Sequence, residues 1–265
     1  MDGRILVTGG TGTIGRRLVP LLEGRGATVR VLTRHAPLGG AADHVVGDVM
    51  TGAGLDAAMT GVEAVVHLAG GAKGDDVAAA NVTAAAERAG VRHILTLSVV
   101  GAGRMPIGYF RAKEQVETIF AASAVPSTVL RAAQVHQLVL RMAAGMTKLP
   151  VAPAPRIRFE PVDAGEVAER LAELASGSPA GMAGELAGPE VLEAEELLRE
   201  YADARGLRRR FVRFGLPGKV GAAYRAGANL AGADARRGRT TWAEFLRTAP
   251  ELTVEGHVDA PKTRS

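Results

Sequence analysis

Apolar segments of strand length alternate with amphipathic segments of helical period through the first half of the chain. Six apolar segments have the composition of buried strands, and they cover residues 4–8, 28–33, 44–47, 62–68, 92–98 and 127–131. Helical patterns start at Ile14 and recur over residues 75–89, which end at Gly90, and over residues 109–122. Strands that alternate with helices build a parallel sheet covered on both faces. The pattern therefore predicts an α/β fold with a doubly wound parallel sheet.

Beyond Arg131 the alternation weakens, and prolines divide the chain into loops and short strands. Asp163 and Glu166 have the spacing of a capping box, which predicts a helix that continues to Leu174. Further helical segments cover residues 193–204 and 242–246. We expect residues 1–265 to form one domain, in which residues 134–265 contribute most of a small C-terminal lobe that binds substrate.

The first strand runs directly into Gly9-Gly10-Thr11-Gly12-Thr13-Ile14-Gly15, and a helix follows. Gly9 permits a tight turn, Gly12 lets the backbone approach a pyrophosphate, and Gly15 lets the helix pack closely on the strand. The helix N-terminus adds unpaired N–H groups and the positive end of its dipole. This order predicts a Rossmann fold whose dinucleotide site includes all seven residues of the turn. An ordinary glycine-rich turn is the alternative.

Ligands of parallel sheets bind beyond the carboxyl ends of the strands. Arg34 follows the second strand, where an acid would bind the ribose of NAD and an arginine suits the 2′-phosphate of NADP. Asp48 follows the third strand and either accepts from the adenine amino group or caps a turn. The cofactor contacts expected at these strand ends are Arg34, Asp48, Val49, Leu68, Ala69 and Gly70. We therefore expect NADP as cofactor, with NADPH preferred over NADH.

Ser98 ends the fifth strand, and Tyr109 and Lys113 share one face of the helix that follows. An ammonium close to a phenol lowers the phenol pKa, which would make Tyr109 a usable proton donor. Gln134 and His136 follow the sixth strand and are candidates for substrate contact. The segment that they open has few charges as far as Pro155, which favours a mostly apolar substrate.

Several segments together resemble the short-chain dehydrogenase/reductase superfamily, in particular its atypical, NmrA-like branch of NAD(P)H-binding proteins. They are the glycine turn, Gly47-Asp48, Leu97-Ser98-Val99-Val100-Gly101, Tyr109-Phe110-Arg111-Ala112-Lys113 and Pro161-Val162-Asp163. The resemblance implies that Tyr109 is the acid/base, that Lys113 binds the nicotinamide ribose and tunes the tyrosine, and that Ser98 orients a carbonyl. The usual site also has an Asn in the helix before the fifth strand, and Asn81 lies near that position.

The expected function is an NADP-dependent reductase of a carbonyl or conjugated carbonyl in a mostly apolar small molecule. The branch also contains proteins that bind the dinucleotide without turnover, so a regulatory NADP(H) sensor is one alternative. An isomerase or epimerase that retains NADP is another.

Composition narrows the possible partners. The chain has no cysteine and therefore no disulfide or cysteine-bound zinc, which suits a cytoplasmic protein. We expect no metal, because no His, Asp and Glu spacing indicates one, and no membrane span, because no apolar run approaches about 20 residues. The net charge is +4, and five arginines between Arg205 and Arg213 are interpreted as a solvated face rather than a nucleic-acid site. A monomer or a homodimer is expected.

Overall fold

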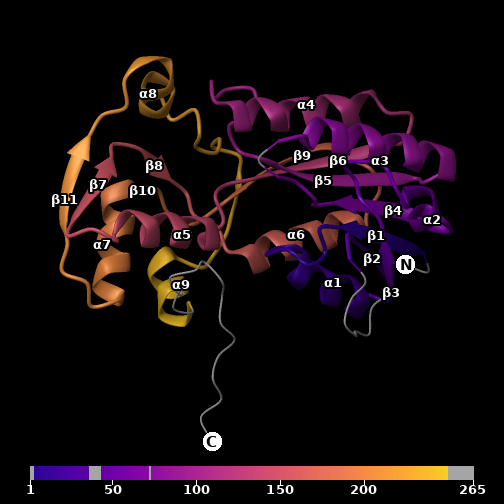
Figure 1. The fold of residues 1–265 in the computed structure, drawn as a ribbon, viewed down its shortest axis with the longest axis horizontal. Helices are drawn as coiled ribbons and strands as arrows, with labels where there is room; N and C mark the ends of the chain where they lie inside the picture. Colours follow the sequence, from indigo (N-terminus) through magenta and orange to yellow (C-terminus); the bar gives the residue numbers. More distant parts are fainter. Residues whose placement is uncertain (1–2, 36–42, 72, 250–265) are drawn as a thin grey trace, which may run out of the picture.

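The computed structural model describes residues 3–35, 43–71 and 73–249. Within them, an eight-stranded parallel sheet has the strand order β12-β9-β6-β5-β4-β1-β2-β3 (Figure 1). The strands are β1 (Arg4–Thr8), β2 (Thr28–Thr33), β3 (Asp43–Val46), β4 (Val62–His67), β5 (His93–Val99), β6 (Ser127–Ala132), β9 (Gly181–Ala187) and β12 (Arg236–Arg237). The predicted fold class is confirmed, and the six expected strands agree with β1 to β6 to within one residue at each end. The structure adds β9 and β12 beyond β6.

Helices cover both faces of this sheet (Figure 1). One face is covered by α1 (Gly15–Gly24) and α6 (Ala164–Ala175), and the other by α2 (Leu55–Met59), α3 (Asp75–Ala89) and α4 (Gly108–Ala122). Consecutive residues of β1 enter different cores: Ile5 and Val7 pack with the α1–α6 layer, whereas Leu6 packs with the α2–α4 layer. Burial on both faces explains why these strands are continuous apolar runs.

A second lobe stands beside the sheet (Figure 1). Its described elements are α5 (His136–Met146), β7 (Val151–Pro155), β8 (Arg158–Phe159), β10 (Leu192–Glu193), α7 (Ala194–Ala204), β11 (Arg210–Phe214), α8 (Gly218–Arg225) and α9 (Trp242–Thr248). The lobe has its own apolar core, in which Trp242 is fully buried against α5 and α7. Residues 134–249 do not all build this lobe, because α6, β9 and β12 return to the sheet.

Asp163 and Glu166 have different tasks from those of a reciprocal capping box. Asp163 Oδ1 accepts from the N–H groups of Gly165 at 2.7 Å and Glu166 at 3.3 Å, so the predicted N-cap of α6 is confirmed. Glu166 Oε1 instead accepts from the N–H groups of Arg239 at 2.8 Å and Thr240 at 3.2 Å. The expected box is therefore wrong in its second half, because Glu166 holds the segment that leads to α9.

The arginine cluster of the second lobe is only partly a solvated face. Arg205 donates to the carbonyl oxygen of Ala249 at 3.0 Å, and Arg209 donates to that of Thr147 at 2.7 Å. These two arginines join neighbouring segments of the lobe, which corrects the interpretation of the cluster as wholly solvated. None of the described helices has the length and apolarity that crossing a membrane requires.

Candidate functional site

The turn after β1 is shaped by two glycines that the protein's own packing requires. Gly9 has φ +71°, and a Cβ there would lie 2.7 Å from the backbone nitrogen of Ala69. A Cβ on Gly15 would overlap the Gly9 carbonyl oxygen and the Gly10 backbone. Gly12 is different, because it is exposed and a Cβ there would meet only the Gly9 oxygen, at 3.2 Å. The open side of Gly12 is where a ligand can approach the backbone.

A hydrogen-bonded group fixes this turn to the end of β4. The Thr8 hydroxyl accepts from the N–H of Ala69 at 3.2 Å and lies 2.9 Å from Nδ1 of His67. Burial, helped by the positive charge of Lys113, lowers the pKa of His67 to about 4. The imidazole is therefore neutral at pH 7, and a hydrogen bond joins its Nδ1 to the Thr8 hydroxyl. His67 is buried, and in this network it has a structural role.

A small cavity of about 100 Å³ opens where β4 and β5 end and α4 begins. Ser98, Tyr109 and Lys113 all line it, so the fold brings the three expected catalytic residues to one place. His67 and Asp75 line the same cavity. The Ser98 hydroxyl is buried and has no hydrogen-bond partner among the described residues. A buried hydroxyl without a partner is costly unless a ligand supplies one, which makes Ser98 the clearest sign of a binding site.

The ammonium of Lys113 is held by an acid that sequence reasoning did not identify. Lys113 Nζ lies 2.7 Å from Asp75 Oδ2, and both side chains are largely buried. The other oxygen of Asp75 accepts from the N–H of Gly71 at 2.8 Å. The sequence pattern identifies Asp75 only as the first residue of a helix, and its place shortly after the small residues 69–71 is the signal that points to the site.

This pairing corrects the expected effect of Lys113 on Tyr109. Partial burial raises the pKa of the Tyr109 phenol, and the negative charge of Asp75 raises it further. The expectation that Lys113 lowers this pKa is therefore wrong, because Asp75 neutralises the ammonium. Tyr109 is a protonated phenol, 48% exposed, and is suited to donating a proton.

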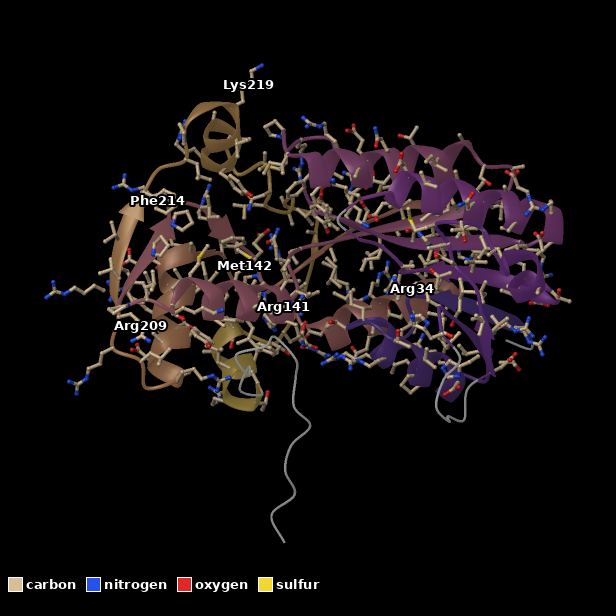
Figure 2. The ribbon with its side chains drawn as sticks, viewed as in Figure 1. Arg34, Arg141, Met142, Arg209, Phe214 and Lys219 are labelled. Carbon is tan, nitrogen blue, oxygen red and sulfur yellow. The ribbon has the colours of Figure 1, made fainter. Side chains whose placement is uncertain are left out.

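The residues expected to contact the adenosine end lie beyond β2 and β3. Arg34 (Figure 2) is exposed directly after β2. Asp48 Oδ1 accepts from the N–H of Met50 at 2.8 Å, so Asp48 does cap a turn, the alternative left open by the sequence. Asn81 donates to the carbonyl oxygens of Val49 at 2.9 Å and Met50 at 3.0 Å. Asn81 thus anchors the loop that contains Asp48 and does not line the cavity of Ser98.

Two candidates for substrate contact, Gln134 and His136, lie outside the cavity of Ser98. His136 is fully buried, with its ring 4.8 Å from that of Phe245 and 5.9 Å from that of Trp242 between centroids. Burial lowers its pKa, against the opposing effect of Asp163. His136 is therefore a core residue, enclosed by Trp242 and Phe245, and is not exposed for the substrate contact that its position after the sixth strand suggests. The backbone of Gln134 pairs with Val162, and neither it nor His136 lines the cavity of Ser98.

Comparison with known proteins decides the family. The model of a family described as NAD(P)H-binding matches residues 9–148, which contain the glycine turn, Ser98, Tyr109 and Lys113. The chain belongs to this NAD(P)H-binding family. The family expected from the sequence motifs is thereby confirmed. Among curated protein sequences, none matches the chain.

Solved structures share the fold at low sequence identity. An NADPH-dependent quinone oxidoreductase from Escherichia coli, complexed with NADPH, has a TM-score of 0.78 at 22% identity, over 92% of this chain and 99% of that one. A nucleoside-diphosphate-sugar epimerase from Staphylococcus aureus has 0.76 at 16%, over 92% and 99%. A triphenylmethane reductase from Citrobacter sp. has 0.73 at 18%, over 87% and 92%. These similarities confirm the fold, which reductases and epimerases share.

The neutral state of His67 predicts a loss of stability in acid. Below pH 6.5 the unfolded chain protonates this histidine, whereas the folded protein does not until about pH 4. The unfolding free energy should therefore fall as pH decreases through this window, by an amount on the order of 3 kcal/mol from His67. Urea unfolding at pH 7 and pH 4 measures the change. His67→Asn should reduce the acid sensitivity, whereas His35→Asn, at an exposed histidine, should not; equal sensitivity of both variants would contradict this assignment.

The negative charge of Asp75 predicts the direction in which an Asp75→Asn variant moves the pKa of Tyr109. Removing the carboxylate charge removes a cause of the raised pKa, so the phenol should ionise at lower pH. Tyrosinate absorbance measured during alkaline titration reports this directly. The Tyr109→Phe protein, titrated in the same way, subtracts the signals of the other two tyrosines. An unchanged Tyr109 titration in Asp75→Asn would show that the acid does not act on the phenol.

Proposed function

We propose that this protein is an NADP-dependent reductase of a carbonyl or conjugated carbonyl in a mostly apolar small molecule. The observation that carries the proposal is the buried, unpartnered hydroxyl of Ser98, which shares a cavity with the Tyr109 phenol. A carbonyl oxygen placed there would accept from both hydroxyls. Two donors that converge on one oxygen stabilise the negative charge that develops on it during reduction.

The residues beside this cavity fit the expected dinucleotide. Gly12 leaves its backbone open, and α1 begins with no side-chain cap on its N-terminal N–H groups, so a pyrophosphate has donors to bind. The exposed Arg34 beyond β2 would bind a 2′-phosphate, and the sequence has no acid between Arg34 and Asp43. Leu68 and Ala69 line the cavity of Ser98, so a nicotinamide bound along them would reach the Ser98 hydroxyl. NADPH, when bound, supplies the hydride.

Each residue of the cavity then has one task. Tyr109 donates the proton to the carbonyl oxygen, and its raised pKa keeps that proton in place at neutral pH. Ser98 orients the same oxygen. Lys113 is 2.7 Å from Asp75, and a Cβ on Gly70 would lie 3.2 Å from Lys113 Nζ. An ammonium this close to Gly70 is placed to donate to a ribose hydroxyl while Asp75 limits its positions.

Nucleotide titration tests the cofactor preference. Purified protein should bind NADPH more tightly than NADH, as followed by nicotinamide fluorescence. Arg34→Gln should weaken NADPH binding roughly tenfold or more, because a charge-assisted contact with phosphate is lost, and should leave NADH binding unchanged. Gly12→Ala is the matched control, because it should weaken the binding of both nucleotides. Equal affinity for the two nucleotides in the unaltered protein would remove the basis for an NADP preference.

The role of Tyr109 is tested by turnover. With NADPH and a quinone or aldehyde substrate found by screening, Tyr109→Phe should lower kcat by about 10²- to 10⁴-fold, while NADPH affinity stays nearly unchanged. Tyr201→Phe is the control, because that tyrosine lies in the core of the second lobe. Turnover retained in Tyr109→Phe would sink the proton-donor role. Tight NADPH binding without turnover of any screened carbonyl would favour the sensor alternative.

A further inference from the structure

The second lobe contains a cavity of about 520 Å³ that is separate from the cavity of Ser98. Its wall is formed where β7 leads into β8, and by the start of α7, β11 and the end of α8. Figure 2 shows two of these elements at the outside of the lobe, α8 carrying Lys219 and β11 ending at Phe214. The volume lies within the range of small-molecule sites, about 300–1,000 Å³.

Four arginines line this cavity: Arg156, Arg158, Arg213 and Arg225. Two of them are engaged by the protein. Arg213 forms a close ion pair with Glu195, and Arg225 donates to the carbonyl oxygen of Leu216 at 3.2 Å. Among the described residues, the guanidinium groups of the other two have no hydrogen-bond acceptor or ion-pair partner.

The acids of the wall do not balance this charge. Glu195 is already bound by Arg213 and also by Arg199, 2.6 Å away. Glu193 is the other acid of the wall, and its backbone N–H donates to Glu196 Oε2 at 2.7 Å in the capping box that begins α7. Four arginines against two acids leave the cavity with an excess of two positive charges. A concave wall concentrates such a potential and attracts anions.

The rest of the wall is apolar. Ile157 is buried, and Ala154 and Pro155 lie beside it. Tyr224 adds an aromatic ring with a neutral phenol, because burial raises its pKa. Guanidinium groups match the two oxygens of a carboxylate or phosphate, and the apolar wall accommodates a carbon skeleton next to that group.

We propose that this cavity is a binding site for a small organic anion, a molecule that carries a phosphate or carboxylate beside an apolar part. Arg156 and Arg158 bind the anionic group, and Ile157 and Tyr224 contact the apolar part. Residues 228 and 229 contact both Arg158 of this site and the loop after β5. Asn229 donates to the carbonyl oxygen of Arg158 at 2.7 Å, and the preceding Ala228 packs against Gly101, in the loop after β5.

Calorimetric titration with inorganic pyrophosphate tests the site. The full-length protein should bind pyrophosphate at low ionic strength, and the double variant Arg156→Gln/Arg158→Gln should lose roughly tenfold or more of that affinity. The double variant Arg88→Gln/Arg92→Gln is the matched control. It removes the same charge from exposed ion pairs, which contribute little to stability, and should bind as the unaltered protein does.

Two further measurements keep the result interpretable. Thermal unfolding of each variant shows whether it folds, and the single variant Arg156→Gln, at an exposed position, replaces the double one if it does not. Repeating the titration with saturating NADP⁺ excludes binding at the glycine turn. Equal affinity in the Arg156/Arg158 variant, no binding by the unaltered protein, or loss of binding on adding NADP⁺ would each overturn the proposal.

A second titration identifies the anionic group that the site prefers, and an inhibition measurement shows how the bound anion affects turnover. Succinate titrated in the same way distinguishes a carboxylate site from a phosphate site. Pyrophosphate that inhibits NADPH-dependent turnover competitively with the screened carbonyl would make the cavity the anionic subsite of the substrate, whereas a change in kcat alone would make it an effector site. The binding result does not depend on turnover, so it stands or falls separately from the reductase proposal.

Discussion

The close approach of two backbone segments, the turn after β1 and the end of β4, determines how the rest of the site is built. Gly9 can lie against Leu68 and Ala69 only because it has no side chain and adopts a positive φ. The Thr8 hydroxyl joins the same segments through the N–H of Ala69 and the ring of His67. The glycine turn and the cavity of Ser98 therefore share one wall, formed by Leu68 and Ala69.

The sequence was sufficient for the sheet as far as β6. Strands buried on both faces are apolar and rich in β-branched residues, so β1 and β2 stand out without any knowledge of their neighbours. The meeting of Ser98 with Tyr109 also follows from topology, because a helix that succeeds a parallel strand begins at that strand's carboxyl edge. The candidate reaction residues could be predicted because their proximity is local to one strand–helix unit.

What the sequence did not reveal depends on contacts between distant segments. The spacing of Asp75 and Lys113 does not indicate that they pair, yet the pair changes the electrostatics of Tyr109. His136 follows a strand as a site residue would, but α9 supplies Trp242 and Phe245 to enclose it. β9 consists largely of glycine, alanine and methionine without a β-branched residue, so it becomes a strand through pairing with β6 rather than through its own propensity.

The return of α6 and β9 to the sheet limits which segments of this chain can be exchanged with those of a relative. The apolar face of α6, with Val167 and Leu171 fully buried, is part of the same core as β1. The lobe is therefore interleaved in sequence with the sheet, and it cannot be exchanged between relatives as one continuous block. Recombination that preserves the core has to cross the chain at several points, between α5 and α6 and again after β9. Substitutions among the residues that line the cavity of the second lobe are then the simpler route by which a new ligand preference arises.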